Sequence, residues 1–132
     1  MKARGIFIRE SLIDCRLPAG LEEMVIDQHS HMLGAIEPVQ IIVTSSPLDR
    51  LPEMAMAVSF SLIPKRFYAH FIDGKLLWVV FPKMICFVPQ GDSVAADRVR
   101  TVGRMFAIQD KQMPFEELFE HDHPNIMREE VR

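Results

Sequence analysis

The sequence predicts an α+β fold in which residues 1–132 form a single domain. We expect a small mixed or antiparallel sheet, centred on a β-hairpin at residues 66–81, with three to four helices packed on it. Three observations lead to this prediction. Several short runs alternate apolar and polar residues, an Asp-Gly pair at 73 and 74 separates two apolar runs, and other segments place apolar residues at helical spacing.

Composition and charge narrow the class of protein. The 132 residues are 48% hydrophobic and 25% charged, as is typical of folded globular domains and not of disordered chains. The formal net charge of −3 gives no global positive field, so we do not expect nucleic acid as a partner. The two cysteines, Cys15 and Cys86, match no metal-binding spacing and predict free thiols in the cytoplasm. The apolar runs are too short for a secretory signal or a membrane span.

The N-terminal third predicts a strand, a helix and a second strand. The first strand is expected from Gly5 to Leu12, where apolar residues alternate. The helix is expected to begin after Gly20, which serves as its N-cap, and to end at Gly34. The residues between them that share one side of such a helix are Leu21, Met24, Val25, Gln28 and Met32. The β-branched segment 37–46 predicts the second strand.

The apolar pattern of residues 53–63 fits both the helical period and the strand period. Large side chains alternate with Ala and Ser, as in a strand, while Leu51, Ala55, Val58 and Leu62 lie on one side of a helix. We predict a helix, because Met and Ala are good helix formers and Pro52 suits a first turn; a strand is the alternative.

The hairpin gives the most detailed prediction. If Asp73 and Gly74 occupy the centre of a tight turn, Ile72 opposes Lys75 and the register follows outward. This register pairs Phe71 with Leu76, His70 with Leu77, Ala69 with Trp78, and Tyr68 with Val79. One face then carries Phe67, Ala69, Phe71, Leu76, Trp78 and Val80; the other carries Tyr68, His70, Ile72, Leu77, Val79 and Phe81. Both faces are apolar, so we expect both to be covered.

The C-terminal third predicts a bent strand and two helices. Because Pro82 cannot enter a primed turn, residues 84–88 are expected to continue the preceding strand as a bent extension; a separate return strand after a looser turn is the alternative. Asp92 or Ser93 caps a helix that ends near Ile108, with a stripe of Ala95, Val99, Val102 and Phe106. Pro114 opens a short helix over residues 114–120, and the tail 124–132 is predicted to be flexible.

Four histidines raise the question of a metal site. In a helix, His29 and His31 point apart and cannot share an ion. His121 and His123 can chelate geometrically, but a lone pair of this kind is a weak motif. We therefore predict no metal and no other cofactor, and keep His121 and His123 as the alternative.

Two further groups of residues are candidate sites. Tyr68, His70, Leu77 and Val79 share one hairpin face, where a small ligand binds if the face opens into a cleft; Tyr68 and His70 are then an acid–base pair. If the face is closed, His70 is a satisfied core residue. Arg98, Arg100 and Arg104 form a basic patch on the predicted helix, to which the acidic segment 116–122 is complementary within one molecule or between two.

Together these features favour a binding protein over an enzyme. The sequence contains no phosphate-binding glycine loop, nucleophile elbow or catalytic triad spacing. The leading hypothesis is a non-catalytic cytoplasmic protein that works by self-association, as a dimer, or by binding a small molecule. The alternative is a small enzyme, metal-dependent through His121 and His123 or acid–base through His70 and Tyr68.

Overall fold

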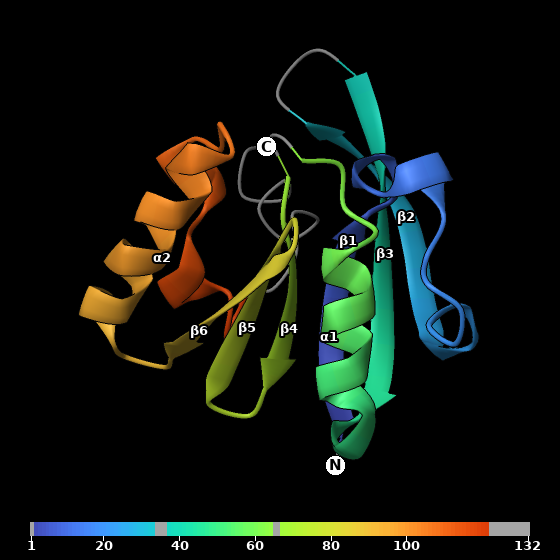
Figure 1. Cartoon of the computed structure of the whole chain (residues 1–132), viewed down its shortest axis with the longest axis horizontal. Coiled ribbons are helices and arrows are strands. Elements are labelled where there is room, and N and C mark those ends of the chain that lie inside the picture. The colour runs from blue at the N-terminus through green and yellow to red at the C-terminus, as the bar shows by residue number, and fades with distance from the viewer. Residues whose placement is uncertain (1, 34–36, 65–66, 122–132) are drawn as a thin grey trace.

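The computed structural model describes residues 2–33, 37–64 and 67–121, and its centre is one six-stranded antiparallel sheet. The strands lie in the order β2-β3-β1-β4-β5-β6 (Figure 1). Their bounds are β1 Lys2–Ile8, β2 Val25–Leu33, β3 Glu37–Pro47, β4 Ala69–Asp73, β5 Leu76–Phe81 and β6 Met84–Pro89. The described α-helices are α1 Leu51–Ser59 and α2 Ser93–Met105. Short 3₁₀ turns occupy Arg9–Ser11, Ile13–Cys15, Glu22–Met24, Leu48–Arg50, Asp110–Gln112 and Phe115–Glu117.

The α+β class is confirmed, but the expected sheet was too small. The predicted hairpin is present as β4 and β5, which are the fourth and fifth strands of the sheet and not its centre. The longest ladders are formed by β1, β2 and β3, because β3 pairs with β2 on one side and with β1 on the other. The first strand begins at Lys2 and ends at Ile8, earlier than the predicted range of Gly5 to Leu12.

The helix predicted after Gly20 is wrong. Only a 3₁₀ turn, Glu22–Met24, forms there, and the chain continues as strand β2 from Val25. β2 pairs antiparallel with β3 almost along its whole length, with an irregularity between Val25 and Asp27. This pairing is between distant segments, so it overrides the local helical spacing of the apolar residues.

The hairpin turn lies one residue later than predicted, so each residue of β4 pairs with a residue two positions further along β5. Asp73 pairs with Leu76 and His70 with Val79, so Gly74 and Lys75 form the turn. Gly74 has a φ of +56°, the conformation that a type II′ turn requires at its first central position. A two-residue change of partner keeps the same residues on each face. The buried clusters place most of the first predicted set on the α1 side (Ala69, Phe71, Trp78 and Val80) and most of the second on the α2 side (Tyr68, Ile72, Leu77, Val79 and Phe81).

Residues 84–89 form a separate strand, which contradicts the predicted bent continuation. β6 turns back and pairs with β5 through a two-residue turn at Pro82 and Lys83. Lys83 has a φ of +61°, so proline first and a left-handed residue second give the pattern of a type II turn. The main-chain N–H of Lys83 also donates to the carbonyl of Ser59 at the end of α1, at 2.9 Å.

The helix predicted for residues 53–63 is present as α1 but is shorter at its end: it begins at Leu51, with Pro52 in its first turn, and ends at Ser59. Leu62 instead forms an isolated antiparallel bridge with Leu12. The cap of the second helix is also as predicted: the Asp92 carboxylate accepts from the N–H of Ala95 at 2.9 Å. α2 ends at Met105, before Ile108, and its buried residues are Ala96, Val99 and Gly103. The expected short helix after Pro114 is reduced to the 3₁₀ turn Phe115–Glu117, and the tail 124–132 lies outside the described residues.

Two large clusters of buried side chains lie on opposite faces of the sheet. On one face, α1 packs through Leu51, Met54, Ala55 and Val58 onto apolar residues of the strands, including Phe7, Ile42, Phe71 and Val80. On the other face, α2 and residues 108–118 cover Leu77, Val79, Phe81 and Val88. Figure 1 shows α1 over the middle strands and α2 beside β5 and β6, so each helix covers only part of the sheet.

Candidate interaction surface

Tyr68 and His70, the predicted acid–base pair, lie next to each other just before and within β4. Their ring centroids are 6.1 Å apart. The Tyr68 hydroxyl donates to the main-chain carbonyl of Gln112 at 2.7 Å, and its ring packs edge-on against Phe115. Burial raises the pKa of Tyr68, because the apolar surroundings disfavour the phenolate, although the charge of Arg100 opposes this effect. This geometry fixes the hydroxyl on a structural partner.

Leu77 and Val79, the other two residues of the predicted ligand face, are fully buried. They contribute to the cluster formed by α2 and residues 108–118. His70 is also buried, and pairs with Val79 across the β4–β5 ladder. Tyr68, Leu77 and Val79 therefore belong to the cluster that α2 and residues 108–118 cover, and His70 lies beside Tyr68 and opposite Val79.

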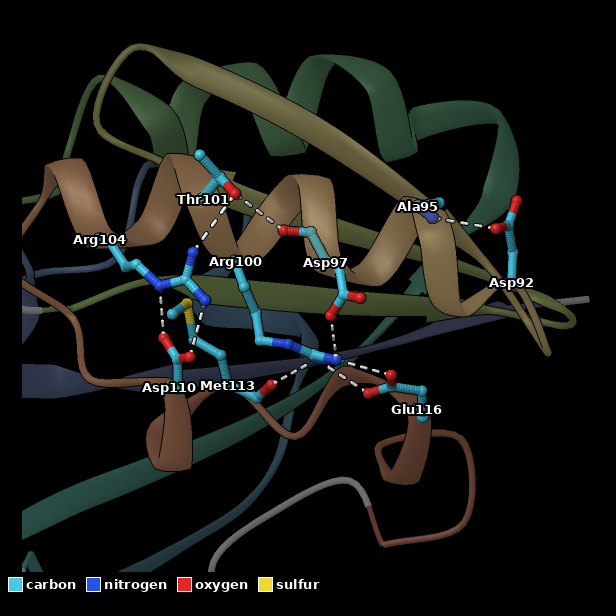
Figure 2. A network of polar contacts seen from close by, with 9 residues as sticks. All are labelled: Asp92, Ala95, Asp97, Arg100, Thr101, Arg104, Asp110, Met113 and Glu116. Carbon is cyan, nitrogen blue, oxygen red and sulfur yellow. Dashed lines mark hydrogen bonds and ion pairs between the residues drawn. The ribbon is translucent and has the colours of Figure 1, made fainter.

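The predicted basic patch is largely neutralised within the molecule. Arg100 donates to both carboxylate oxygens of Glu116, at 2.8 and 2.6 Å, to the carbonyl of Met113 at 3.1 Å and to Asp97 at 3.2 Å (Figure 2). Arg104 holds Asp110 in the same two-pronged way, at 2.8 and 2.7 Å. These ion pairs attach the C-terminal segment to α2.

Protonation at the basic patch follows from the ion pairs. The hydrogen bond to Asp110 raises the pKa of Arg104, and the same bond lowers the pKa of the Asp110 carboxyl. Arg98 is exposed on the same helix. Arg100 and Arg104 are therefore bonded to carboxylates within the molecule, whereas no ion pair joins Arg98 to another described residue.

The histidines are placed differently from the prediction. Because β2 is a strand, His29 and His31 point to the same face, so the reason given for separating them was wrong. The Nδ1 of His29 lies 3.4 Å from the Asp27 carboxylate. His121 is exposed after the last 3₁₀ turn, and His123 lies outside the described residues. Within residues 2–33, 37–64 and 67–121, no three His, Cys, Asp or Glu side chains gather as a metal would require.

A polar depression of about 570 Å³ lies where residues 9–17 meet the start of β2. Its lining residues are Arg9, Arg16, Leu17, Glu22, Val25 and Gln28. The guanidinium of Arg9 is already bonded to the carbonyl of Cys15 and to the side-chain oxygen of Gln28, both at 3.1 Å. The carboxylate of Glu22 opposes the positive charge, so the depression has no clear preference for an anion.

The most distinctive surface lies on the α1 side of β5 and β6. Trp78 on β5 and Phe87 on β6 are cross-strand partners whose rings meet edge-on, with centroids 4.8 Å apart. Phe87 is 47% exposed and Trp78 is half-buried. The indole Nε1 of Trp78 is buried and finds no acceptor among the described residues, which is costly for a buried donor.

The same side of the sheet carries further apolar groups from α1, which packs against β5 and β6. Met56 and Phe60 lie one turn apart on the outer flank of α1 and are 52% and 61% exposed. We call this set the Trp78–Phe87 surface; it comprises Met56, Phe60, Trp78, Ile85 and Phe87. Singly exposed apolar residues are ordinary, but several on adjoining elements are typical of an interaction site.

Sequence reasoning missed this surface for a definite reason. Trp78 was expected on a covered face of the hairpin, and residues 84–88 were expected to extend the preceding strand, so Phe87 had no cross-strand partner and no edge strand was foreseen there. The available signal was Pro82 followed by Lys83, which fits a type II turn as well as a bend.

Comparison with other proteins gives no family assignment: no protein-family model, curated protein or solved structure matches this chain. None of the helices in the described ranges has both the length and the apolar composition needed to cross a membrane.

Proposed function

We propose that this protein works by binding another macromolecule through the Trp78–Phe87 surface and does not catalyse a reaction. The observation that carries the proposal is the edge-on pair of Trp78 and Phe87, left partly exposed beside α1. Aromatic side chains of this kind contribute most of the binding energy at many protein interfaces, because they bury large apolar areas at little cost in conformational entropy.

The size of the effect is sufficient for binding. Each buried square ångström of apolar surface contributes roughly 25 cal/mol, and a large aromatic side chain that becomes fully covered contributes about 1.5–3 kcal/mol. Phe87, Phe60 and Met56 each have about half of their surface left to bury. Together they supply several kcal/mol, of which part offsets the entropy lost on association.

The environment of Tyr68 and His70 supports a structural role for the pair that was the main catalytic alternative. The hydroxyl of Tyr68 is engaged by a main-chain carbonyl, and the apolar surroundings disfavour the phenolate that a general base requires. No cofactor enters the proposal. A reducing compartment, the cytoplasm, remains part of it, because Cys15 and Cys86 are free thiols.

Site-specific photocrosslinking in the producing cell tests the proposal. A benzophenone amino acid replaces Phe87 in one variant and Met105, which is 80% exposed on α2 outside this surface, in the matched control. We expect a discrete adduct of defined mass from position 87 and none from position 105. If position 87 gives no adduct, or both positions give the same one, the surface is not an interaction site.

A further inference from the structure

The two edges of the sheet differ in how they are protected. An edge strand presents unpaired N–H and C=O groups, and monomeric proteins usually blunt it with charges, bulges or proline. β2, at one edge, has a bulge between Val25 and Asp27 and a polar run at residues 27–31. β6, at the other edge, has no charged residue and keeps an unbroken register with β5; its one proline is Pro89, the last residue of the strand.

The direction of the free groups on β6 follows from the ladder. The N–H of Gln90 donates to the carbonyl of Lys75 at 2.8 Å, which extends the β5–β6 pairing by one position. Because hydrogen-bonded pairs alternate in an antiparallel ladder, the even-numbered residues of β6 face β5. The N–H and C=O groups of Ile85 and Phe87 therefore point to the outer edge. Among the described residues none bonds to them.

We infer that the partner at this surface is a second copy of the chain, an inference that rests on the proposed function. The β6 strands of the two copies pair antiparallel about a two-fold axis at Cys86. In this arrangement Ile85 of each copy lies opposite Phe87 of the other, and both exchange hydrogen bonds. Every outward N–H of the strand is then satisfied. The missing N–H of Pro89 falls outside the shared ladder.

Charge favours a second copy over an unrelated strand. Lys83 precedes β6 and Asp92 follows it, so the strand is flanked by a positive and a negative residue. Antiparallel self-pairing directs the Lys83 end of each copy toward the Asp92 end of the other, at both ends of the ladder. The same symmetry brings the two Trp78–Phe87 surfaces to one side of a continuous twelve-stranded sheet, which is twice the six strands of one copy.

The register has a chemical signature. In an antiparallel sheet, residues that face each other without hydrogen bonds have Cα atoms about 4.5 Å apart, within the range of about 4.4–6.8 Å for disulfides. Cys86 would face Cys86 of the second copy in this way. Burial raises the pKa of the Cys86 thiol, so oxidation is run at alkaline pH, where the thiolate forms.

Two measurements on the full chain test the inference. Sedimentation equilibrium of the wild type, of Phe87→Pro and of the matched control Phe87→Ala gives the dimer dissociation constant. Both variants lose the aromatic ring, but only proline removes an outward N–H, and it breaks no bond to β5. We expect the dimer dissociation constant of Phe87→Pro to be at least about tenfold higher than that of Phe87→Ala. In parallel, Cys15→Ser is oxidised with diamide, with Cys86→Ser as the control.

The inference holds if the wild type has twice the mass of the 15.2 kDa chain, if proline weakens the dimer more than alanine does, and if only Cys15→Ser forms a covalent dimer. A strict monomer at millimolar concentration overturns it, as does a dimer without crosslinking at Cys86. If the wild type is monomeric while Phe87 crosslinks to a different protein, the proposed function stands and only the second copy is excluded. If neither occurs, both fail.

Discussion

The ion pair between Arg100 and Glu116 gives a sharp prediction about how the C-terminal segment is held. Arg100→Met keeps an unbranched apolar stem of similar length and removes the guanidinium. It deletes two hydrogen bonds to Glu116, one to the Met113 carbonyl and one to Asp97. The side chain of Arg100 is 14% exposed, but that of Glu116 is 41% exposed, so solvent screens part of the attraction.

The magnitude follows from these contacts. Hydrogen bonds to charged groups contribute about 1.5–3 kcal/mol when buried, and exposed ion pairs contribute less than about 1 kcal/mol. For this half-exposed pair we expect a loss of about 1–2 kcal/mol in the free energy of unfolding. Arg98→Met, on the exposed side of the same helix, is the matched control and should change stability by less than about 0.5 kcal/mol.

The assay is urea unfolding of the wild type, both single variants of the pair, and the double variant with Glu116→Gln. The double-mutant cycle isolates the coupling between Arg100 and Glu116, which we expect to be about 1 kcal/mol. Hydrogen exchange should also become faster in residues 113–118, because their attachment to α2 is weakened. A coupling energy near zero, or equal losses for Arg98→Met and Arg100→Met, would show that this ion pair does not hold the C-terminal segment on α2.

Three further predictions concern the core. Because burial holds the pKa of Tyr68 above its ordinary value of 10.0, stability should be complete below about pH 10 and fall above it by up to about 1.4 kcal/mol per pH unit. Tyr68→Phe should remove this loss of stability. In the wild type, tyrosinate absorbance reports the ionisation of Tyr68 directly, since the chain has one tyrosine. Gly5→Ala should destabilise by about 1–3 kcal/mol in thermal or urea unfolding, because the new Cβ would lie 2.5 Å from the Thr44 hydroxyl and 2.8 Å from the Phe71 ring. Leu77→Ala should lower the free energy of unfolding by about 2–5 kcal/mol in the same assay, since Leu77 is fully buried beneath α2. A loss below about 1 kcal/mol would contradict the burial of Leu77 under α2.

Local sequence pattern was enough for the parts of the fold that depend on neighbouring residues. Asp92 capped α2 as expected, and Pro52 with Met and Ala gave α1, because caps and propensity act within one turn. The two hairpin faces were also predictable, since a shift of two residues in the pairing leaves the alternation of side chains unchanged. The turn position was not, because Gly74 can serve as the first or the second central residue.

The remaining differences arise from contacts between distant segments. β2 has apolar residues at helical spacing, and only its pairing with β3 makes it a strand. β6 became an edge because Lys83 accepts a left-handed conformation, in a turn held by the Ser59 carbonyl. The Trp78–Phe87 surface depends on that turn, because the turn brings Phe87 beside Trp78. The sequence pattern alone therefore did not predict that the two rings are in contact.

Pairing of β6 with a second β6 is measured by amide hydrogen exchange of Ile85 and Phe87, followed by NMR over a concentration series. Both N–H groups point away from β5, whereas those of Cys86 and Val88 point toward it. We expect all four amides to be protected at high concentration, and Ile85 and Phe87 to lose protection on dilution while Cys86 and Val88 keep it. Rapid exchange of Ile85 and Phe87 at every concentration would contradict a paired β6 edge.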